Sequence, residues 1–257
     1  MQIAFDPYSG TLQLMKRDQV FEEVAKAGYE GLDLLMASGF VDGRNEADIA
    51  HMIGLAKKHR LAVPVVCYGP HTVTTPGMEK QSQETMDICL HVVKKFNAPV
   101  ILIWPNMPKN ATKPQALETL ERNLREMAPK AEKEGRVIAL EFEKNCPLDN
   151  YREGVEFIRK MGLKVTLCAD TYHMWNDQAD PYAAALAMKG VLGTVHISAS
   201  DRGEPGNPND KFDYKTFMRG LREIGYNETL AAQYKLTDIA SLKRAADFMK
   251  KLVAGLG

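Results

Sequence analysis

The chain has 257 residues, and its 33 basic and 33 acidic side chains give a formal net charge of zero. Hydrophobic residues make up 45% of the chain and charged residues 26%, spread evenly without a linker-like stretch, which favours one folded unit over residues 1–257. A neutral chain without a basic block has no electrostatic reason to bind nucleic acid or an anionic membrane, so we expect neither partner.

The first residues and the cysteines bear on the cellular compartment. Met1 is followed directly by Gln-Ile-Ala-Phe-Asp, without the basic region and apolar core of a secretory signal, so we expect a cytoplasmic protein. No stretch approaches the roughly 18 apolar residues that a membrane span needs. The cysteines lack C-x-x-C spacing, and we expect them to be reduced and buried. They are Cys67, Cys89, Cys146 and Cys168.

Short apolar segments alternate with amphipathic segments eight times along the chain. The apolar segments are rich in branched residues, as strands covered on both faces are. The expected strands are residues 2–5, 31–35, 62–67, 100–104, 137–141, 165–170, 193–197 and 229–233. The expected helices are residues 20–27, 47–59, 79–96, 115–134, 151–161, 182–189, 214–224 and 239–252, in which apolar residues recur every three or four positions.

This alternation predicts an α/β fold that consists of a single (β/α)8 TIM barrel. Repeated strand–helix units form a parallel sheet with right-handed crossovers, and eight is the number of strands that closes such a barrel. An open, doubly wound sheet is the alternative. It is disfavoured because the segment after the first strand, Asp6-Pro-Tyr-Ser-Gly10, lacks the G-x-G-x-x-G phosphate loop.

Metal-capable side chains lie where the last four expected strands give way to loops. Barrel enzymes gather their active sites at these strand ends, so residues remote in sequence can converge there. Residues two positions apart share a face of a strand, and the inward neighbours at positions 139, 168, 194 and 231 are small. Two carboxylates, an imidazole and an amide suit one divalent ion, Mn²⁺ first and Mg²⁺, Co²⁺ or Zn²⁺ as alternatives. The predicted ligands are Glu141, Asp170, His196 and Gln233.

Three sequence strings around these positions resemble the xylose-isomerase-like barrel superfamily, specifically its ketose 3-epimerase, hydroxypyruvate isomerase and inosose isomerase-like branch. The similarity is diffuse up to residue 135 and concentrated in residues 139–236. The strings are Asp170-Thr-Tyr-His173-Met, His196-Ile-Ser-Ala-Ser-Asp-Arg202-Gly-Glu-Pro-Gly206 and Gln233-Tyr-Lys.

The resemblance implies roles for individual residues. In that family a Glu, an Asp, a His and a Glu on the last four strands bind one divalent ion, which implies Glu141, Asp170, His196 and position 233. A His three residues after the Asp and an Arg six residues after the ligand His contact substrate oxygens, which implies His173 and Arg202. By resemblance, the catalytic residues are therefore Glu141, His173 and Arg202.

Two positions depart from the family pattern. Residue 233 is Gln where the resemblance leads us to expect Glu, and the family's Glu-x-x-Asn appears as Glu141-Phe-Glu143-Lys144. The epimerases of the family use both glutamates as bases, on opposite faces of a carbon next to a carbonyl. An amide ligates through its oxygen but does not accept and return a proton. Gln233 thus favours one-base isomerisation or elimination, unless Glu143 or Lys144 supplies a substitute acid or base.

Other residues at strand ends are candidates for substrate binding. Tyr68 and His71 follow the third expected strand, and Trp104 ends the fourth. We expect them to line the substrate pocket together with Glu143 and Lys144. The alternative is that they pack beneath the loops.

The leading hypothesis is a metal-dependent sugar isomerase or epimerase that removes a proton next to a metal-polarised carbonyl of a small ketose or related polyhydroxylated compound. The alternatives are a metal-dependent lyase, which eliminates a group β to the carbonyl of a keto-sugar or keto-glycoside, and a catalytically silent sugar-binding subunit. Retention of Glu141, Asp170 and His196 argues against a decayed site. A nuclease would need more metal-binding residues on the early strands and a basic groove. The sequence leaves the sugar, the metal and homo-oligomerisation open.

Overall fold

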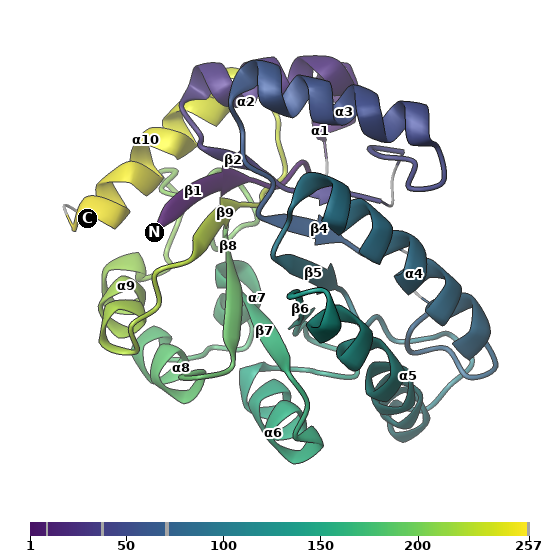
Figure 1. The fold of residues 1–257 in the computed structure, drawn as a ribbon. Helices are drawn as coiled ribbons and strands as arrows, with labels where there is room; N and C mark the ends of the chain where they lie inside the picture. Colours follow the sequence, from purple (N-terminus) through teal and green to yellow (C-terminus); the bar gives the residue numbers. More distant parts are fainter. Residues whose placement is uncertain (9, 37–38, 70–71, 256–257) are drawn as a thin grey trace.

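Parallel strands form a ring in the computed structural model, which describes residues 1–8, 10–36, 39–69 and 72–255 (Figure 1). The strand order is β2-β1-β9-β8-β7-β6-β5-β4-β3, and every neighbouring pair is parallel. Helices surround this ring, which confirms the predicted TIM barrel. The strands are β1 (Gln2–Phe5), β2 (Gly31–Leu32), β3 (Leu34–Leu35), β4 (Val65–Cys67), β5 (Val100–Ile103), β6 (Val137–Glu141), β7 (Val165–Asp170), β8 (Leu192–Ile197) and β9 (Thr229–Ala232).

The second strand of the barrel is interrupted at Asp33. β2 pairs with β1 and β3 pairs with β4, so residues 31–35 join the two edges of the sheet and close the ring. The Asp33 amide donates to the Phe5 carbonyl at 2.9 Å, and the Met36 amide donates to the Cys67 carbonyl at 3.1 Å. This interruption explains why nine strands stand where the sequence predicts eight.

Four other strand boundaries differ from the predicted ones, one of them the start of β8, which lies at Leu192 instead of residue 193. The third barrel strand begins at Val65 instead of residue 62, because Pro64 has no N–H to donate to the ladder. The strands β5 and β9 end one residue earlier than predicted. Trp104 and Gln233 therefore follow strand ends and belong to the loops above the barrel.

The long helices alternate with the strands as predicted, and their ends follow local capping chemistry. The Asn45 side chain accepts from two amides at the start of α3, and Asn150 does the same for α6, as N-cap residues do. The helices on the outside of the barrel are α2 (Arg17–Ala27), α3 (Glu46–His59), α4 (Glu79–Phe96), α5 (Lys113–Lys133), α6 (Tyr151–Met161), α8 (Pro181–Ala187), α9 (Tyr214–Glu223) and α10 (Ala240–Ala254).

Two short helices were not predicted, and both follow strands on the side of the candidate site. They are α1 (Thr11–Leu14) and α7 (Thr171–Asn176). Asp170 is the N-cap of α7, because its Oδ1 accepts from the Tyr172 amide at 2.7 Å. His173 consequently lies on a short helix that directly follows β7.

The register of the sheet directs the predicted ligands into the barrel. Glu141 pairs with Cys168, Asp170 pairs with His196, and His196 pairs with Ala231. Side chains at paired positions of parallel strands share one face, and all of these are buried. The last four strands therefore bring their terminal side chains together over the barrel core.

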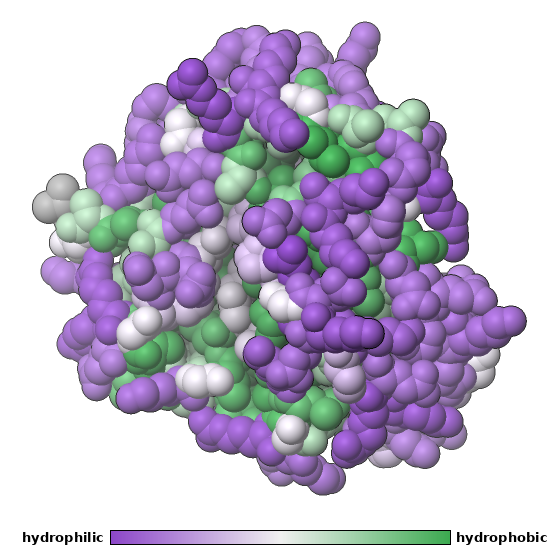
Figure 2. Space-filling model, in the orientation of Figure 1, coloured by the Kyte–Doolittle hydropathy of each residue, from purple (hydrophilic) through white to green (hydrophobic). Residues whose placement is uncertain are grey.

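The outer surface is largely hydrophilic on the face that Figure 2 shows, with apolar side chains visible mainly between the helices. None of the described helices is both long and apolar enough to cross a bilayer. All four cysteines are free, and Cys146 is only half-buried, in contrast to the expectation that all are buried.

Candidate functional site

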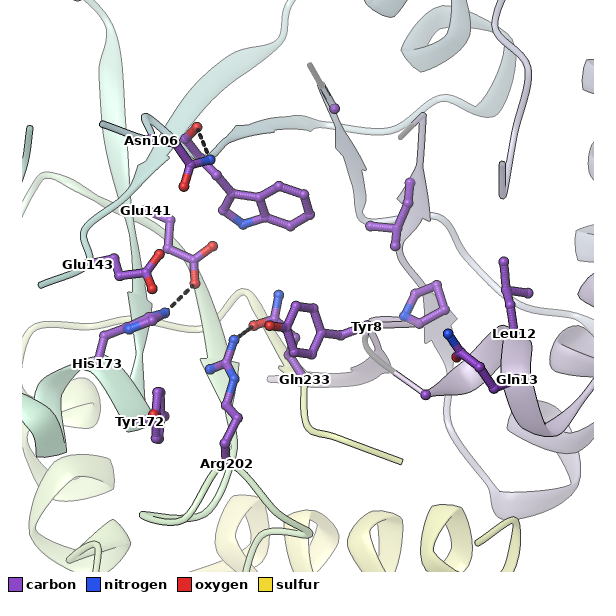
Figure 3. Close-up of a pocket in the computed structure, with 15 residues that line it drawn as sticks. Tyr8, Leu12, Gln13, Asn106, Glu141, Glu143, Tyr172, His173, Arg202 and Gln233 are labelled. Carbon is purple, nitrogen blue, oxygen red and sulfur yellow. Dashed lines mark hydrogen bonds and ion pairs between the residues drawn. The ribbon is translucent and has the colours of Figure 1, made fainter. Parts of the chain in front are cut away.

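A cavity of about 720 Å³ opens where the strands end, at the rim that holds the active site in TIM-barrel enzymes. Leu35 and Glu141 reach it from the last positions of β3 and β6. Figure 3 shows its polar side chains facing one another across the opening. Six predicted site residues line it: Trp104, Glu141, Glu143, His173, Arg202 and Gln233. Asp170 and His196 are fully buried directly beneath.

Glu141 lies between two imidazoles. Its Oε1 is 3.6 Å from His173 Nε2 and 3.6 Å from His196 Nδ1. The side chain is 3% exposed, and neither of its oxygens has a hydrogen-bond partner among the described residues. A buried carboxylate normally has its oxygens hydrogen-bonded, so this one is available to an ion or a substrate.

Arg202 joins two of the predicted ligands. It donates from Nη1 to Asp170 Oδ2. It also donates from Nη2 to Gln233 Oε1 at 2.5 Å (Figure 3). Burial alone would raise the pKa of Asp170, but the guanidinium, with His173 and His196, outweighs it and holds that pKa at about 2. Asp170 is therefore ionised at neutral pH, which suits it to bind a cation.

The backbone and two aromatic rings fix the position of Arg202. Its φ of 62° lies in the left-handed region, where the Arg202 amide donates to the Ala199 carbonyl at 2.9 Å and its own carbonyl accepts from Lys235. The guanidinium carbon lies 4.8 Å from the ring centre of Tyr8 and 5.0 Å from that of Tyr172. These cation–π contacts hold the charged group at the mouth of the cavity.

A second acidic layer lies beneath the predicted ligands, and the sequence analysis missed it. Asp6 and Asp33 are fully buried, and each has an Oδ2 atom 4.0 Å from His196 Nε2. Burial raises the pKa of Asp6 to about 6, and burial together with Asp6 raises that of Asp33 well above its usual range. The sequence did contain a signal for Asp6, because this residue directly follows a predicted strand. Glu141 and Gln233 were selected for standing at the ends of predicted strands.

The arrangement fits a divalent cation. Glu141 and His196 present four side-chain atoms without hydrogen-bond partners among the described residues, although both side chains are buried. The 3.6 Å between Glu141 Oε1 and His196 Nδ1 is close to the separation of two donors around one ion with bonds of roughly 2.1 Å. Glu141, Asp170, His196 and the oxygen of Gln233 would hold the ion, with carboxylate and imidazole donors suited to Mn²⁺ or Zn²⁺.

Two other residues that the sequence analysis singled out, Tyr68 and Lys144, do not line this cavity. Tyr68 is 1% exposed, and its hydroxyl donates to the Ser82 carbonyl at 2.8 Å, so it packs beneath the loops and does not line the cavity. Lys144 is exposed and does not line the cavity either. His71 lies outside the described residues.

A curated relative with a similar segment is the L-ribulose 3-epimerase of Mesorhizobium japonicum. It is 34% identical to this chain over 95 residues. That match spans 37% of this chain and 31% of the epimerase. The chain thus matches about a third of the relative's length.

Two solved structures share the architecture of the whole chain. D-psicose 3-epimerase from Clostridium cellulolyticum H10, in a structure with D-tagatose, superposes with a TM-score of 0.85 at 20% identity, over 100% of this chain and 99% of that one. The IOLI protein, in a structure with a bound zinc atom, superposes with a TM-score of 0.78 at 15% identity, over 100% and 98% of the two chains. At such identities the likeness concerns the fold.

The family assignment rests on sequence over most of the chain. The family model described as xylose isomerase-like TIM barrel matches residues 21–252, which confirms the resemblance that the strings after the last strands carry. This chain belongs to the xylose isomerase-like TIM barrel family.

Proposed function

We propose that the protein is a metal-dependent isomerase or epimerase of a small ketose or a related polyhydroxylated carbonyl compound. The observation that carries the proposal is the Glu141 carboxylate, which lines the cavity without a hydrogen-bond partner among the described residues. Sugar epimerases among its relatives support the same substrate class. A carboxylate of this kind is suited to remove a proton from a bound substrate.

The residues around Glu141 have distinct roles in this proposal. A bound divalent ion would polarise the substrate carbonyl and stabilise the negative charge that develops on its oxygen. Glu141 removes the proton from the carbon next to the carbonyl and delivers it to the former carbonyl carbon on the same face, while the hydroxyl proton of the first carbon moves to the former carbonyl oxygen. His173, 3.6 Å from Glu141, binds a substrate hydroxyl, and Arg202 binds a second substrate oxygen with a charge that it cannot lose.

The cavity favours proton transfer on one face of the substrate. The carboxylates that line it are Glu141 and Glu143, and both extend from the end of β6 on the same side in Figure 3. Gln233 and Tyr8 lie across from them, and neither is a carboxylate. A base on the opposite face is what inversion at a carbon by two bases requires. One-base isomerisation on Glu141 is therefore the form of the reaction that we propose.

Deuterium exchange tests this proposal directly. The Mn²⁺-loaded protein is incubated with a panel of ketoses in deuterated water, and NMR locates the exchanged carbon. We expect deuterium at one carbon next to the carbonyl, with reversible formation of the aldose. Rapid, reversible inversion at C3 would overturn the one-base mechanism, and no exchange with any ketose would overturn the substrate class.

Elimination is the second candidate, because it also needs only one base. Gln233 cannot act as a second base, so Glu141 would serve in either reaction. A lyase would remove the same proton and then expel a group β to the carbonyl. The same NMR experiment with a 3-keto-glycoside distinguishes the two. Release of the aglycone together with an unsaturated ketone would identify a lyase, and an intact glycosidic bond would favour the isomerase.

A further inference from the structure

One acidic side chain holds both ends of the Arg202 segment, residues 200–206. This segment lies in the loop that joins β8 to α9. The Oδ1 atom of Asp210 accepts from the Ser200 amide at 3.0 Å. Its Oδ2 atom accepts from the Gly206 amide at 2.8 Å. A single carboxylate thus binds the backbone on both sides of Arg202.

The same carboxylate also joins the loop to the start of α9. Its Oδ1 accepts from the Phe212 amide at 3.1 Å, and its Oδ2 accepts from the Tyr214 hydroxyl at 2.7 Å. That hydroxyl can donate instead to the Ser198 carbonyl at 2.8 Å, but an ionised carboxylate is the stronger acceptor. An ionised carboxylate offers roughly four acceptor sites, so these donors use all of them. An asparagine would offer one acceptor oxygen and leave part of the donors without a partner.

The backbone of Arg202 needs this support because its conformation is strained. Its φ of 62° lies in the left-handed region, where a residue other than glycine persists only if the surrounding structure fixes it. The Arg202 amide donates to the Ala199 carbonyl, and the Ala199 amide donates to the Gly203 carbonyl at 3.1 Å. These bonds fix the shape of the turn, and the Lys235 amide holds it at one point from outside. Asp210 fixes the chain where it enters and leaves the turn.

We propose that Asp210 is a positioning residue, which holds Arg202 in the backbone conformation that directs its guanidinium into the cavity. Arg202 lines the cavity and Asp210 does not, so Asp210 would act on a substrate through Arg202. The consequence for turnover rests on the substrate role given to Arg202 under the proposed function. The role of Asp210 in the backbone of the loop does not depend on that function.

Two variants of Asp210 and one matched control test the proposal. Asp210→Ala removes every acceptor contact of the side chain, whereas Asp210→Asn keeps one acceptor oxygen. The control is Asp213→Ala. Asp213 belongs to the same loop, but its side chain is the N-cap of α9 and accepts from the Thr216 amide at 3.0 Å. Its loss should lower stability without releasing the Arg202 segment. If Asp210→Ala does not fold, Asp210→Asn is compared with Asp213→Asn.

The first readout is hydrogen exchange of the backbone amides, followed by mass spectrometry without substrate. We expect peptides that cover residues 200–206 to exchange about 10-fold faster or more in Asp210→Ala, as for loss of one hydrogen bond to a charged group. The same peptides should exchange at the wild-type rate in Asp213→Ala. Wild-type exchange in Asp210→Ala would overturn the proposal, and so would an equal rise in both variants.

The second readout is turnover of a ketose. The probe is whichever of D-fructose, D-tagatose, D-psicose and L-ribulose the wild type exchanges fastest in deuterated water. We expect kcat to fall by roughly 10–100-fold in Asp210→Ala, as for a small misplacement of a group in the site. Asp210→Asn should recover part of this loss, and Asp213→Ala should turn over as wild type does. An unchanged kcat in Asp210→Ala would overturn the positioning role.

A double variant shows whether Asp210 acts through Arg202. Once Arg202→Met has removed the guanidinium, Asp210→Ala should lower kcat by no more than about 2-fold further, because nothing is left for Asp210 to position. A further loss as large as that in the wild-type background would mean that Asp210 supports the site as a whole, which would overturn the positioning role. If wild type exchanges none of the ketoses, the proposed substrate class is wrong, and hydrogen exchange still decides whether Asp210 holds the Arg202 segment.

Discussion

The Arg202 guanidinium donates to the side-chain oxygen of Gln233 at 2.5 Å, which joins a permanent cation to the neutral member of the four predicted ligands. The same guanidinium contacts Asp170. Arg202 is thus held by two predicted ligands and two aromatic rings while it faces the cavity. A donor that is fixed in advance in this way does not have to reorganise when charge develops on a substrate oxygen.

Replacement of Arg202 by Met should separate turnover from metal binding. We expect kcat/KM for the identified ketose to fall by roughly 10²–10³-fold, the range for loss of one fixed donor to a developing oxyanion. Metal content should stay near that of wild type, because Arg202 is a cation and not a ligand. Metal analysis and steady-state kinetics measure the two effects. Arg244→Met, which changes a half-exposed arginine on α10, is the control. Loss of the metal in the Arg202 variant would contradict its substrate role.

Replacement of His196 by Ala should remove the metal. His196 is fully buried, and its Nδ1 lies 3.6 Å from Oε1 of Glu141, another predicted ligand. Loss of a residue that only hydrogen-bonds to a metal ligand lowers metal affinity by roughly 10–100-fold. We expect the loss of His196, a predicted ligand, to lower Mn²⁺ affinity by at least that much. Calorimetric titration measures this loss. His51→Ala alters a half-exposed histidine on α3 and should bind Mn²⁺ as wild type does. Unchanged affinity in the His196 variant would rule out this ligand set.

Replacement of Glu141 by Gln should stop proton exchange while leaving the shape of the site intact. The amide keeps an oxygen for ligation but cannot take up the substrate proton. We expect the rate of deuterium incorporation to fall by roughly 10²–10⁴-fold, the usual contribution of a general base. The control is Glu143→Gln, which changes the other carboxylate on the same wall of the cavity. If Glu143→Gln stops exchange and Glu141→Gln does not, the base has been assigned to the wrong residue.

Much of the fold follows from local sequence, whereas the details of the site depend on contacts between distant segments. The alternation of strands and helices is a property of short segments, and β6 and β7 end at the polar residues Glu141 and Asp170. The break at Asp33 arises from the hydrogen bonds that close the ring. No periodicity in a single segment contains that information.

The second acidic layer, Asp6 and Asp33, could not be predicted from local sequence either. Asp6 stands at a strand end and met the criterion that selected Glu141, but the resemblance to a known family directed attention to the last four strands. Asp33 lies inside an apolar run, where one carboxylate gives no sign of pairing with another. Only the closed barrel brings Asp6 and Asp33 to the same nitrogen of His196.

The metal-free protein should lose stability as the pH rises through the titration range of Asp6. Burial raises the pKa of this carboxyl from 3.8 to about 6, so the folded state holds its proton after the unfolded chain has released it. A raised carboxyl pKa favours the folded state below pH 4, and this contribution is lost between about pH 4 and pH 6. The shift corresponds to about 3 kcal/mol of unfolding free energy. Asp6→Asn has no proton to lose at this position, so its stability relative to wild type should be similar at pH 4 and greater by about that amount at pH 7. Urea unfolding in EDTA at both pH values measures the difference, and a difference that is independent of pH would show that Asp6 stays ionised in the folded protein.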